Sequence, residues 1–387
     1  MHMGGVRRYV ALTATASFLF AACSSSSSST APSVAAPASV APAASVAASV
    51  AAAMVPVRLQ LQWYPQAQFA GYFAAKEQGY FKAEGLDVKI VDGGGTIAPQ
   101  AVGSQADGPE FSIAWQPKVL QAREAKSDLV NIAQIFQRSG TLSVSWKDSN
   151  ITKPAEFKGK KVGVWDFGNE FEVTAGAKKA GLDQGTDYTK YIQDFNMSLL
   201  LSRQIDVSEA MIYNEYAQLL ESLNPKTGEL VKPSELNVIN WNNEGSAMLQ
   251  DALFARAGWL AKPGNEDVAV RFLKASFKGW MYCRANPDAC IQYTVNAGST
   301  LGAGHQRWMM NEINPLVWPS PNGIGIMDPA SWQQTVDVAV STGIIKAAPP
   351  ADAYRTDLAK KALEGITEDA KGLDFKKGVV PTTPGGF

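Results

Sequence analysis

Two patterns of apolar residues alternate along the main part of the chain. Short runs such as RLQLQ (residues 58–62), LDVKIV (86–91) and FSIAW (111–115) have the length and composition of β-strands. Between these runs, residues 70–78 and 117–125 have helical character. Because strands that alternate with helices tend to pair in parallel, the pattern predicts an α/β fold with a largely parallel sheet.

A second set of alternating elements follows. KKVGVW and EAMIYNEY are expected as strands, with a helix at MSLLLSRQ between them. After NVINWNNEGS the chain is expected to cross back, so that helices at residues 264–282 and 329–343 cover the first lobe. We therefore predict lobe 1 from residues 56–145 and 245–365, and lobe 2 from residues 146–244. Two crossings make two hinge segments, an arrangement that suits closure around a ligand.

The two ends of the chain differ in composition from these lobes. Residues 1–22 contain two arginines, an apolar stretch and two small residues, which is the layout of a secretory signal peptide. Residues 23–55 are almost entirely Ser, Ala, Pro and Val, too poor in large apolar side chains to fold, and predict a tether. Residues 366–387 return to Gly, Lys, Pro and Thr and are expected to form a loose tail.

Cys23 directly follows Ala21 and Ala22, and this arrangement resembles a lipobox, in which the cysteine is diacylated after cleavage. Phe20 stands where the usual pattern has Leu. The serine run after Cys23 is typical of a tether, so we expect an extracytoplasmic lipoprotein anchored to the cell membrane. The alternative is an ordinary secretory signal followed by a free cysteine.

Charge and cysteine content narrow the class of protein. The formal net charge is −1, which gives no basic excess for nucleic-acid binding. After the signal, no apolar run is long enough to span a membrane. Cys283 and Cys290 flank an expected turn at Asn-Pro-Asp and predict a local disulfide, with two buried thiols as the alternative. Their spacing is not C-x-x-C and His305 is the one histidine after the signal, so we expect no metal site.

Candidate binding residues follow the strands, because ligands of open α/β sheets bind at the carboxyl ends of strands. They are Trp63, Tyr64, Gln66, Gln68, Phe69 and Tyr72 after the first strand, Trp115 and Gln116 after FSIA, Ser139 near the first crossing, and Trp165, Asn169, Glu170, Tyr213, Asn214 and Glu215 in the second lobe.

These candidates share a chemistry. Any single aromatic residue at a strand end is more often core packing than a ligand platform, and a glutamate is more often solvated. Their concentration changes this interpretation, because several aromatic rings beside neutral amides suit a planar, weakly charged heteroaromatic ligand.

Four stretches, QWYPQAQFAGYFAA, FGNEFE, MIYNEYAQ and GHQRWMMNEINPLVWPSP, resemble the solute-binding lipoproteins of ABC importers. The resemblance is to the group that binds thiamine-pyrimidine precursors, sulfonates and riboflavin, and is closest to the riboflavin-binding lipoproteins. SQADGPEFSI departs from the family pattern at one turn. The resemblance implies a two-lobe fold of the periplasmic-binding-protein type (type II) with the ligand in the interlobe cleft. It also implies riboflavin as the transported ligand, an ABC permease as partner and no cofactor; we expect a monomer.

Three alternatives stay open. A thiamine-pyrimidine precursor would use a single aromatic platform. A sulfonate or nitrate would need an anion site, for which Arg138 beside Ser139 and Thr141 is the candidate. A fold-related pyrimidine-synthesising enzyme relies on a cysteine-rich motif and histidines, whereas here the cysteines are expected to be paired and one histidine remains. We therefore expect no catalysis.

Overall fold

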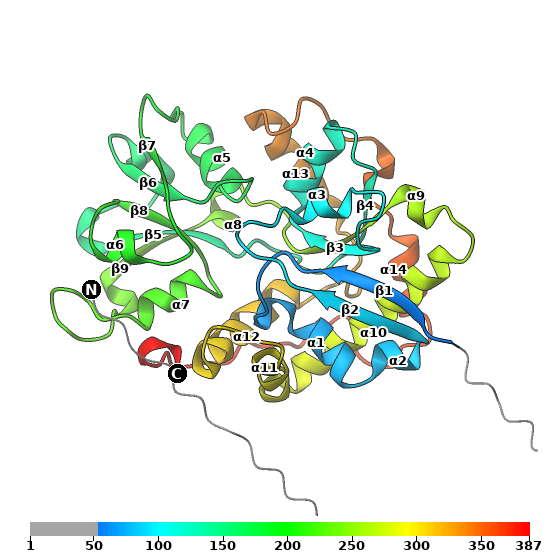
Figure 1. Cartoon of the computed structure of the whole chain (residues 1–387). Helices are drawn as coiled ribbons and strands as arrows, with labels where there is room; N and C mark the ends of the chain where they lie inside the picture. The colour runs from blue at the N-terminus through cyan, green and yellow to red at the C-terminus, as the bar shows by residue number, and fades with distance from the viewer. Residues whose placement is uncertain (1–52) are drawn as a thin grey trace, which may run out of the picture. The chain divides into compact units, whose positions relative to one another are not determined.

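The computed structural model describes residues 53–387, which contain two β-sheets with helices packed around each (Figure 1). The predicted signal peptide, Cys23 and all but the last residues of the predicted tether lie outside the described residues. None of the helices within residues 53–387 has the length and apolar character needed to cross a membrane.

The first sheet has five strands in the order β2-β1-β3-β10-β4. They are β1 (Val55–Gln60), β2 (Leu86–Val91), β3 (Phe111–Ala114), β4 (Leu129–Gln134) and β10 (Ala252–Arg256). β1 pairs in parallel with β2 and β3, and β10 runs antiparallel to β3 and β4. Four of its strands therefore share one direction, as the alternating pattern predicts. We call the part of the chain built on this sheet the first lobe.

The second sheet repeats this arrangement in the order β7-β6-β8-β5-β9. Its strands are β5 (Thr141–Trp146), β6 (Lys161–Val164), β7 (Thr189–Ile192), β8 (Val207–Met211) and β9 (Leu236–Asn240). β6 is parallel to β7 and β8, while β5 is antiparallel to β8 and β9. In each sheet the antiparallel strand is the one that arrives from the other sheet. The part of the chain built on this sheet is the second lobe.

β5 corrects the predicted start of the second lobe. The sequence analysis ends the first part of lobe 1 after residue 145, but β5 lies between β8 and β9 in the second sheet. The first crossing therefore precedes Thr141. All six residues of β5 are buried, and a strand buried on both faces carries no alternation that would indicate which sheet it joins.

Helices surround both sheets. Their bounds are α1 (Ala70–Glu77), α2 (Tyr80–Ala83), α3 (Pro99–Gly103), α4 (Gln116–Glu124), α5 (Phe171–Lys179), α6 (Ser198–Leu201), α7 (Glu215–Leu220), α8 (Trp241–Glu244), α9 (Ala257–Leu260), α10 (Asn265–Ala285), α11 (Pro287–Asn296), α12 (Ala303–Val317), α13 (Pro329–Thr342) and α14 (Asp357–Leu363). α1, α4, α10 and α13 confirm predicted helices. α13 contacts both α4 and α5, so it touches both lobes rather than the first alone.

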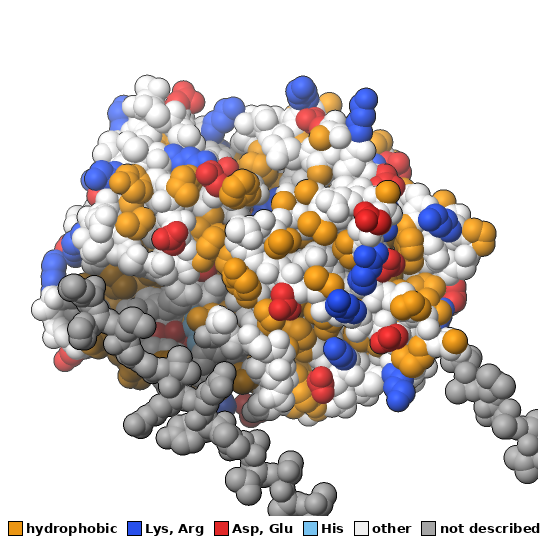
Figure 2. Space-filling model, viewed as in Figure 1, with side chains coloured by type: hydrophobic (Ala, Val, Ile, Leu, Met, Phe, Trp, Pro, Cys, Tyr) orange, Lys and Arg blue, Asp and Glu red, His pale blue; other side chains and the backbone are white. Residues whose placement is uncertain are grey.

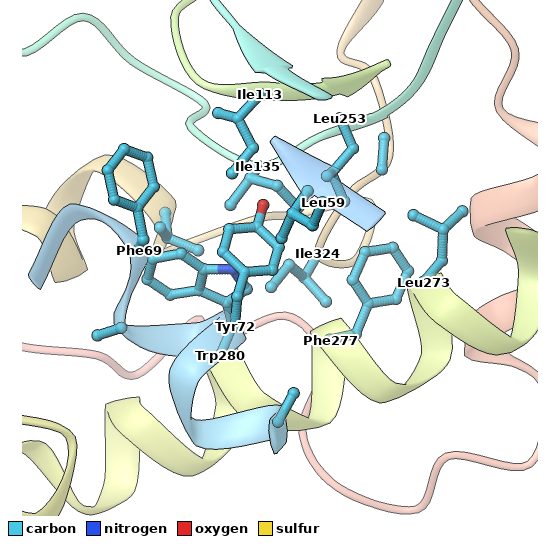
Figure 3. Packing of buried hydrophobic residues seen from close by; sticks show 14 of the residues in the cluster. Leu59, Phe69, Tyr72, Ile113, Ile135, Leu253, Leu273, Phe277, Trp280 and Ile324 are labelled. Atoms are coloured by element: carbon cyan, nitrogen blue, oxygen red, sulfur yellow. The ribbon is translucent and has the colours of Figure 1, made fainter. Parts of the chain in front are cut away.

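The largest apolar core lies where α1 crosses α10 below the first sheet (Figure 3). Glycines allow this close approach, because a Cβ on Gly279 would collide with the carbonyl of Gly71 and a Cβ on Gly71 would collide with the ring of Trp280. The Tyr72 ring packs edge-on against Trp280, with centroids 5.7 Å apart. Leu59 of β1 and Phe277 of α10 belong to the same core. This core fixes the first strand and the loop that follows it.

Cys283 and Cys290 form the predicted disulfide, which joins the last turn of α10 to α11 across a Cα–Cα distance of 5.5 Å. The prediction that residues 366–387 form a loose tail is wrong. Its backbone finds partners on both lobes: Lys371 accepts from the Ser320 N–H at 2.8 Å, and the Gly385 N–H donates to the Glu221 carbonyl at 3.0 Å. The red end of the chain accordingly lies beside α12 and α7 in Figure 1. Ile366, Ala370 and Phe375 also pack against the largest apolar core, so apolar contacts and backbone hydrogen bonds together hold this segment.

Candidate functional site

A pocket of about 330 Å³ lies between the two lobes, at the carboxyl ends of strands from both sheets. From the first lobe it is lined by the segments after β1, β2 and β3. From the second lobe it is lined by the segments after β6, β7 and β8. This is the position where open α/β sheets bind their ligands. Its volume falls at the lower end of the range for small-molecule sites.

Nine of the fifteen residues predicted to bind ligand line this pocket. They are Trp63, Gln66, Gln68, Trp115, Trp165, Asn169, Tyr213, Asn214 and Glu215.

Three of the predicted aromatic residues lie outside the pocket. Phe69 and Tyr72 point into the core beside Trp280, because the chain already turns into a 3-10 helix (Ala67–Phe69) before α1 and so directs both rings inward (Figure 3). Tyr64 has 48% of its surface exposed and packs edge-on against Trp63, with ring centroids 5.3 Å apart. Tyr64 therefore supports a lining residue without lining the pocket itself.

Three predicted polar residues also lie outside the pocket, each held by another group. The Gln116 side chain is fully buried and accepts from Asn131 Nδ2 at 2.8 Å. The Ser139 hydroxyl donates to Glu172 Oε2 at 2.6 Å beside the first crossing. Glu170 accepts from the Gly168 N–H at 2.9 Å and thereby shapes the loop after β6. Strand-end position alone does not distinguish a lining side chain from one directed beneath the pocket.

Sequence reasoning missed several lining residues, which come mostly from two segments. They are Gln62, residues 94–100, Lys118, Asp166, Phe167, residues 192–195 and Met211. The glycine run at residues 93–95 could have been predicted to lie at the site, because it follows a strand. A Cβ on Gly94 would lie 2.6 Å from the Tyr64 ring, so glycine lets this loop pass close to Tyr64. β7 is short and partly exposed, and its pattern gave no strand prediction from which to place residues 192–195.

Aromatic rings from both lobes meet at the mouth of the pocket. Phe195, on the loop after β7, lies 4.2 Å from the Trp63 ring and 5.6 Å from the Trp165 ring, measured between centroids. It is stacked on Trp165 with an interplanar angle of 14° and tilted by 53° to Trp63. Trp165 is itself fixed by a hydrogen bond from its Nε1 to the Asp194 carbonyl at 3.2 Å. Aromatic rings therefore line both sides of the cleft and contact each other through Phe195.

Asp251, at the end of the second crossing, orients three residues that line the pocket. Its carboxylate accepts from Trp115 Nε1 at 2.8 Å and from Gln68 Nε2 at 2.8 Å, and Gln62 Nε2 lies 3.5 Å from it. Gln66 Nε2 in turn donates to Gln68 Oε1 at 2.6 Å. Burial raises the pKa of Asp251 to about 7. The sequence analysis did not identify Asp251, whose one signal is an acidic residue directly before an apolar strand.

Charged groups on the pocket wall are mostly acidic. Lys118 is the one Lys or Arg among the lining residues that the structure describes, whereas Asp166, Asp194 and Glu215 are acidic. The ammonium of Lys118 lies 4.6 Å from the centre of the Trp115 ring and donates to Asn169 Oδ1 of the second lobe at 2.7 Å. Burial lowers the pKa of Lys118 to about 8.

A buried hydrogen-bond chain connects the pocket to α12. Glu215 accepts from the Met211 N–H at 3.0 Å and from Asn214 Nδ2 at 2.8 Å, and burial raises its pKa to about 7. Asn214 Oδ1 lies 3.0 Å from His305 Nε2, and His305 Nδ1 lies 2.8 Å from Glu221 Oε2. Both ring nitrogens of His305 are therefore engaged by protein partners.

The two cysteines and the histidine of the described residues are engaged by other protein groups. Cys283 and Cys290 are bonded to each other, and both ring nitrogens of His305 have protein partners. Within residues 53–387, no three or more His, Cys, Asp or Glu side chains are placed to hold a metal ion. The arrangement offers aromatic faces, amides and one lysine to a small molecule.

Comparison with known proteins agrees with this geometry. The family model described as "NMT1/THI5 like" matches residues 66–290, which is more than half of the chain. The chain belongs to the NMT1/THI5-like solute-binding protein family. It is 24% identical over 304 residues to the riboflavin-binding protein RibY of Chloroflexus aurantiacus, covering 75% of this chain and 82% of that protein. It is 23% identical over 296 residues to the formylaminopyrimidine-binding protein of Halalkalibacterium halodurans, covering 73% and 84% respectively.

Solved structures of this family's fold are similar throughout the described lobes. The periplasmic aliphatic sulphonate-binding protein SsuA of Escherichia coli has a TM-score of 0.56 and 15% identity, covering 84% of this chain and 97% of that chain. The desulfurization enzyme DSZB has a TM-score of 0.52 and 13% identity, covering 80% and 99%. These similarities show the type II periplasmic-binding-protein fold, as predicted. Because one such neighbour is an enzyme, the fold alone does not decide between binding and catalysis.

Proposed function

We propose that this protein, the solute-binding component of an ABC importer, captures riboflavin in the pocket between its lobes. The observation that supports riboflavin most strongly is the set of aromatic rings contributed from both sides of the cleft. Trp63, Phe195 and Trp165 together present a broad apolar surface, and each well-placed aromatic pair adds roughly 0.5–1.5 kcal/mol beyond area burial. A three-ring isoalloxazine uses such a surface more fully than a single ring does.

The charges of the pocket argue against an anionic ligand such as a sulfonate. Arg138, the candidate for an anion site, directs its guanidinium to the carbonyls of Pro315 at 3.1 Å and Pro319 at 3.0 Å. It does not line the pocket, whose charged lining residues are Lys118, Asp166, Asp194 and Glu215. A sulfonate would therefore meet one basic lining residue beside three acidic ones. Riboflavin is uncharged at neutral pH and meets no such repulsion.

A thiamine-pyrimidine precursor is the second candidate. The observation that favours it is the buried Glu215, whose raised pKa of about 7 lets it act as a carboxylic acid or a carboxylate toward an aminopyrimidine. The formylaminopyrimidine-binding relative adds support. Against this candidate, a single ring leaves most of the aromatic surface without a partner.

We further propose a partner that receives the ligand and a site at which the protein is anchored to the membrane. An ABC permease is the proposed partner of a monomeric receptor, and a lipid on Cys23 is the proposed anchor, with the serine-rich segment as its tether. Changing Cys23 to Ser should move the protein from the membrane fraction to the soluble fraction, while Cys283→Ser should leave it in the membrane fraction. Membrane retention of the Cys23 variant would contradict the anchor.

A ligand panel tests the proposed function. A ligand that binds only the folded state raises the melting temperature, so riboflavin, an aminopyrimidine and an alkanesulfonate can be compared on one protein sample. We expect riboflavin to give the largest rise. A larger rise with the aminopyrimidine would favour the second candidate, and a larger rise with the sulfonate would refute both.

A further inference from the structure

The residues at the mouth of the pocket are apolar and exposed to solvent. Four large apolar side chains that line the pocket have between 38% and 78% of their surface exposed, and they are Ile97, Phe167, Ile192 and Phe195. Ile97 follows β2 and Ile192 ends β7, which are edge strands of the two sheets, so both lobes contribute to the mouth. In Figure 2, hydrophobic side chains are visible on both lobes where the two approach each other.

The inner end of the pocket has the opposite character. Polar and charged side chains that follow the inner strands β1, β3 and β8 line it, and none has more than 8% of its surface exposed. They are Gln62, Gln66, Gln68, Lys118, Asn214 and Glu215.

This distribution reverses the one that folding favours. Burial of a polar group costs free energy and burial of an apolar group is favourable, so a protein usually places polar side chains in water and apolar ones inside. Apolar side chains that gather in water around a pocket mark a surface that a ligand or partner covers.

Phe167 shows most clearly that stability does not explain the mouth. It is the most exposed of the four apolar residues there, and its backbone has φ 65°, in the left-handed region that a residue with a Cβ rarely adopts. Its loop is held at the cleft, because Asn169 Oδ1 accepts from Lys118 Nζ of the first lobe at 2.7 Å. The chain thus keeps a phenyl ring in solvent at the mouth, where neither its exposure nor its backbone favours it.

The apolar mouth is continuous with the aromatic rings of the pocket. Phe195 lies 4.2 Å from the Trp63 ring and is stacked on Trp165, measured between centroids. A planar ligand that lies against Trp63 or Trp165 can therefore extend outward along apolar surface as far as the mouth.

These observations give the ligand a direction in the pocket. We propose that the pocket takes a planar ligand with one polar and one apolar end, whose polar end lies inside and whose apolar end lies between Ile97, Phe167 and Ile192 at the mouth. The inference rests on the proposed function, because the isoalloxazine of riboflavin has a pyrimidine ring with carbonyl and N–H groups at one end and a dimethylbenzene ring at the other. The two methyl groups of riboflavin then contact the mouth.

The test compares riboflavin with 7,8-didemethylriboflavin, which lacks only these two methyl groups. Because each buried methyl group adds to affinity, we expect the unmodified protein to bind riboflavin about fivefold more tightly than the demethylated flavin. In the double variant Ile97→Thr with Phe167→Asn, the two flavins should bind within about twofold of each other. Asparagine adopts positive φ readily, so the change at Phe167 fits its backbone. Circular dichroism and melting temperature verify that the variant is folded.

Leu223→Asn is the matched control, because Leu223 is also an exposed apolar residue but does not line the pocket. This variant should keep the fivefold preference for the methylated flavin.

Equal binding of the two flavins to the unmodified protein would overturn the inference and leave the proposed function intact, and this comparison needs no variant. A preference as large in the double variant as in the unmodified protein would also overturn it, because the methyl groups would then lie against another part of the pocket. If riboflavin does not bind the unmodified protein, the inference fails together with the proposed function.

Discussion

The carboxylate of Asp251 accepts a hydrogen bond from the indole Nε1 of Trp115 at 2.8 Å. Asp251 ends the second crossing between the sheets, and Trp115 follows β3 and lines the pocket. The bond therefore connects a segment that joins the two sheets to a wall of the binding site. Gln68 Nε2 donates to the other oxygen of the same carboxylate, at 2.8 Å, so one buried acid orients two lining side chains.

Asp251→Asn tests this connection. The amide keeps the size of the side chain, but its NH2 group then opposes either the Trp115 N–H or the Gln68 amide, both of which are donors. We expect riboflavin to bind about tenfold more weakly, measured by fluorescence titration. Asp288→Asn, whose side chain is exposed and distant in the fold, is the matched control and should bind normally. Unchanged affinity in Asp251→Asn would show that Asp251 does not position the lining residues.

The buried Glu172 predicts a pH dependence of stability. Burial raises its pKa from 4.5 to about 8, so folding favours the protonated acid. The stability that this adds is fully present below about pH 4.5 and is lost as the pH rises through about 8. Between these values one such group lowers the free energy of unfolding by about 1.4 kcal/mol per pH unit.

Glu172→Gln mimics the protonated acid and should remove this dependence. We expect the free energy of unfolding of the variant to fall less steeply than that of the unmodified protein between pH 6 and pH 8. Urea denaturation at several pH values measures it. The pKa values of Asp251 and Glu215 are also raised, so part of the pH dependence of the free energy of unfolding remains in both proteins. Parallel slopes would mean that Glu172 is ionised in the folded state at neutral pH.

Flavin mononucleotide should bind more weakly than riboflavin. Its phosphate adds negative charge to a ligand that enters beside Asp166, Asp194 and Glu215, with Lys118 as the one lining cation in the described part of the chain. We expect at least about tenfold weaker binding at low salt, or about 1.4 kcal/mol. Asp194→Asn should narrow the gap, whereas Asp374→Asn, outside the pocket, should not. Equal affinities for the two flavins would contradict an acidic pocket.

The bond between Cys283 and Cys290 predicts a stability difference. It closes a short loop between α10 and α11, and a loop of this length restricts the unfolded chain by about 2–3 kcal/mol. Cys283→Ser with Cys290→Ser should lower the free energy of unfolding by that amount without changing riboflavin affinity. A titration of free thiols in denatured, unreduced protein provides an independent check, since two reactive thiols would refute the bond.

The sequence predicted which segments form helices and strands better than it predicted which lobe each segment joins. The helices at α1, α4 and α10 and the strands β1, β2 and β3 follow from local patterns of apolar residues. The lobe to which β5 belongs did not follow from such a pattern, because a fully buried strand fits either sheet and its place is set by pairing with β8 and β9.

In the candidate site, too, local patterns predicted some residues and missed those that are placed by long-range contacts. Trp63, Trp115 and Trp165 were found because they follow strands directly. Phe195 and Asp251 depend on contacts between segments distant in the sequence, which no local pattern carries. Phe69 and Tyr72 were misplaced because a short helical turn directs both rings into the core.

Riboflavin binding itself is tested most directly by its own fluorescence, which stacking against tryptophan quenches. Titration of riboflavin with the protein should quench the fluorescence, and Trp63→Ala and Trp165→Ala should each weaken binding by at least about tenfold, or roughly 1.4 kcal/mol. Tyr191→Ala removes an exposed ring that does not line the pocket and should bind as the unmodified protein does. The account would be contradicted if the protein did not quench riboflavin fluorescence and riboflavin did not raise the melting temperature of the protein, while an aminopyrimidine did raise it.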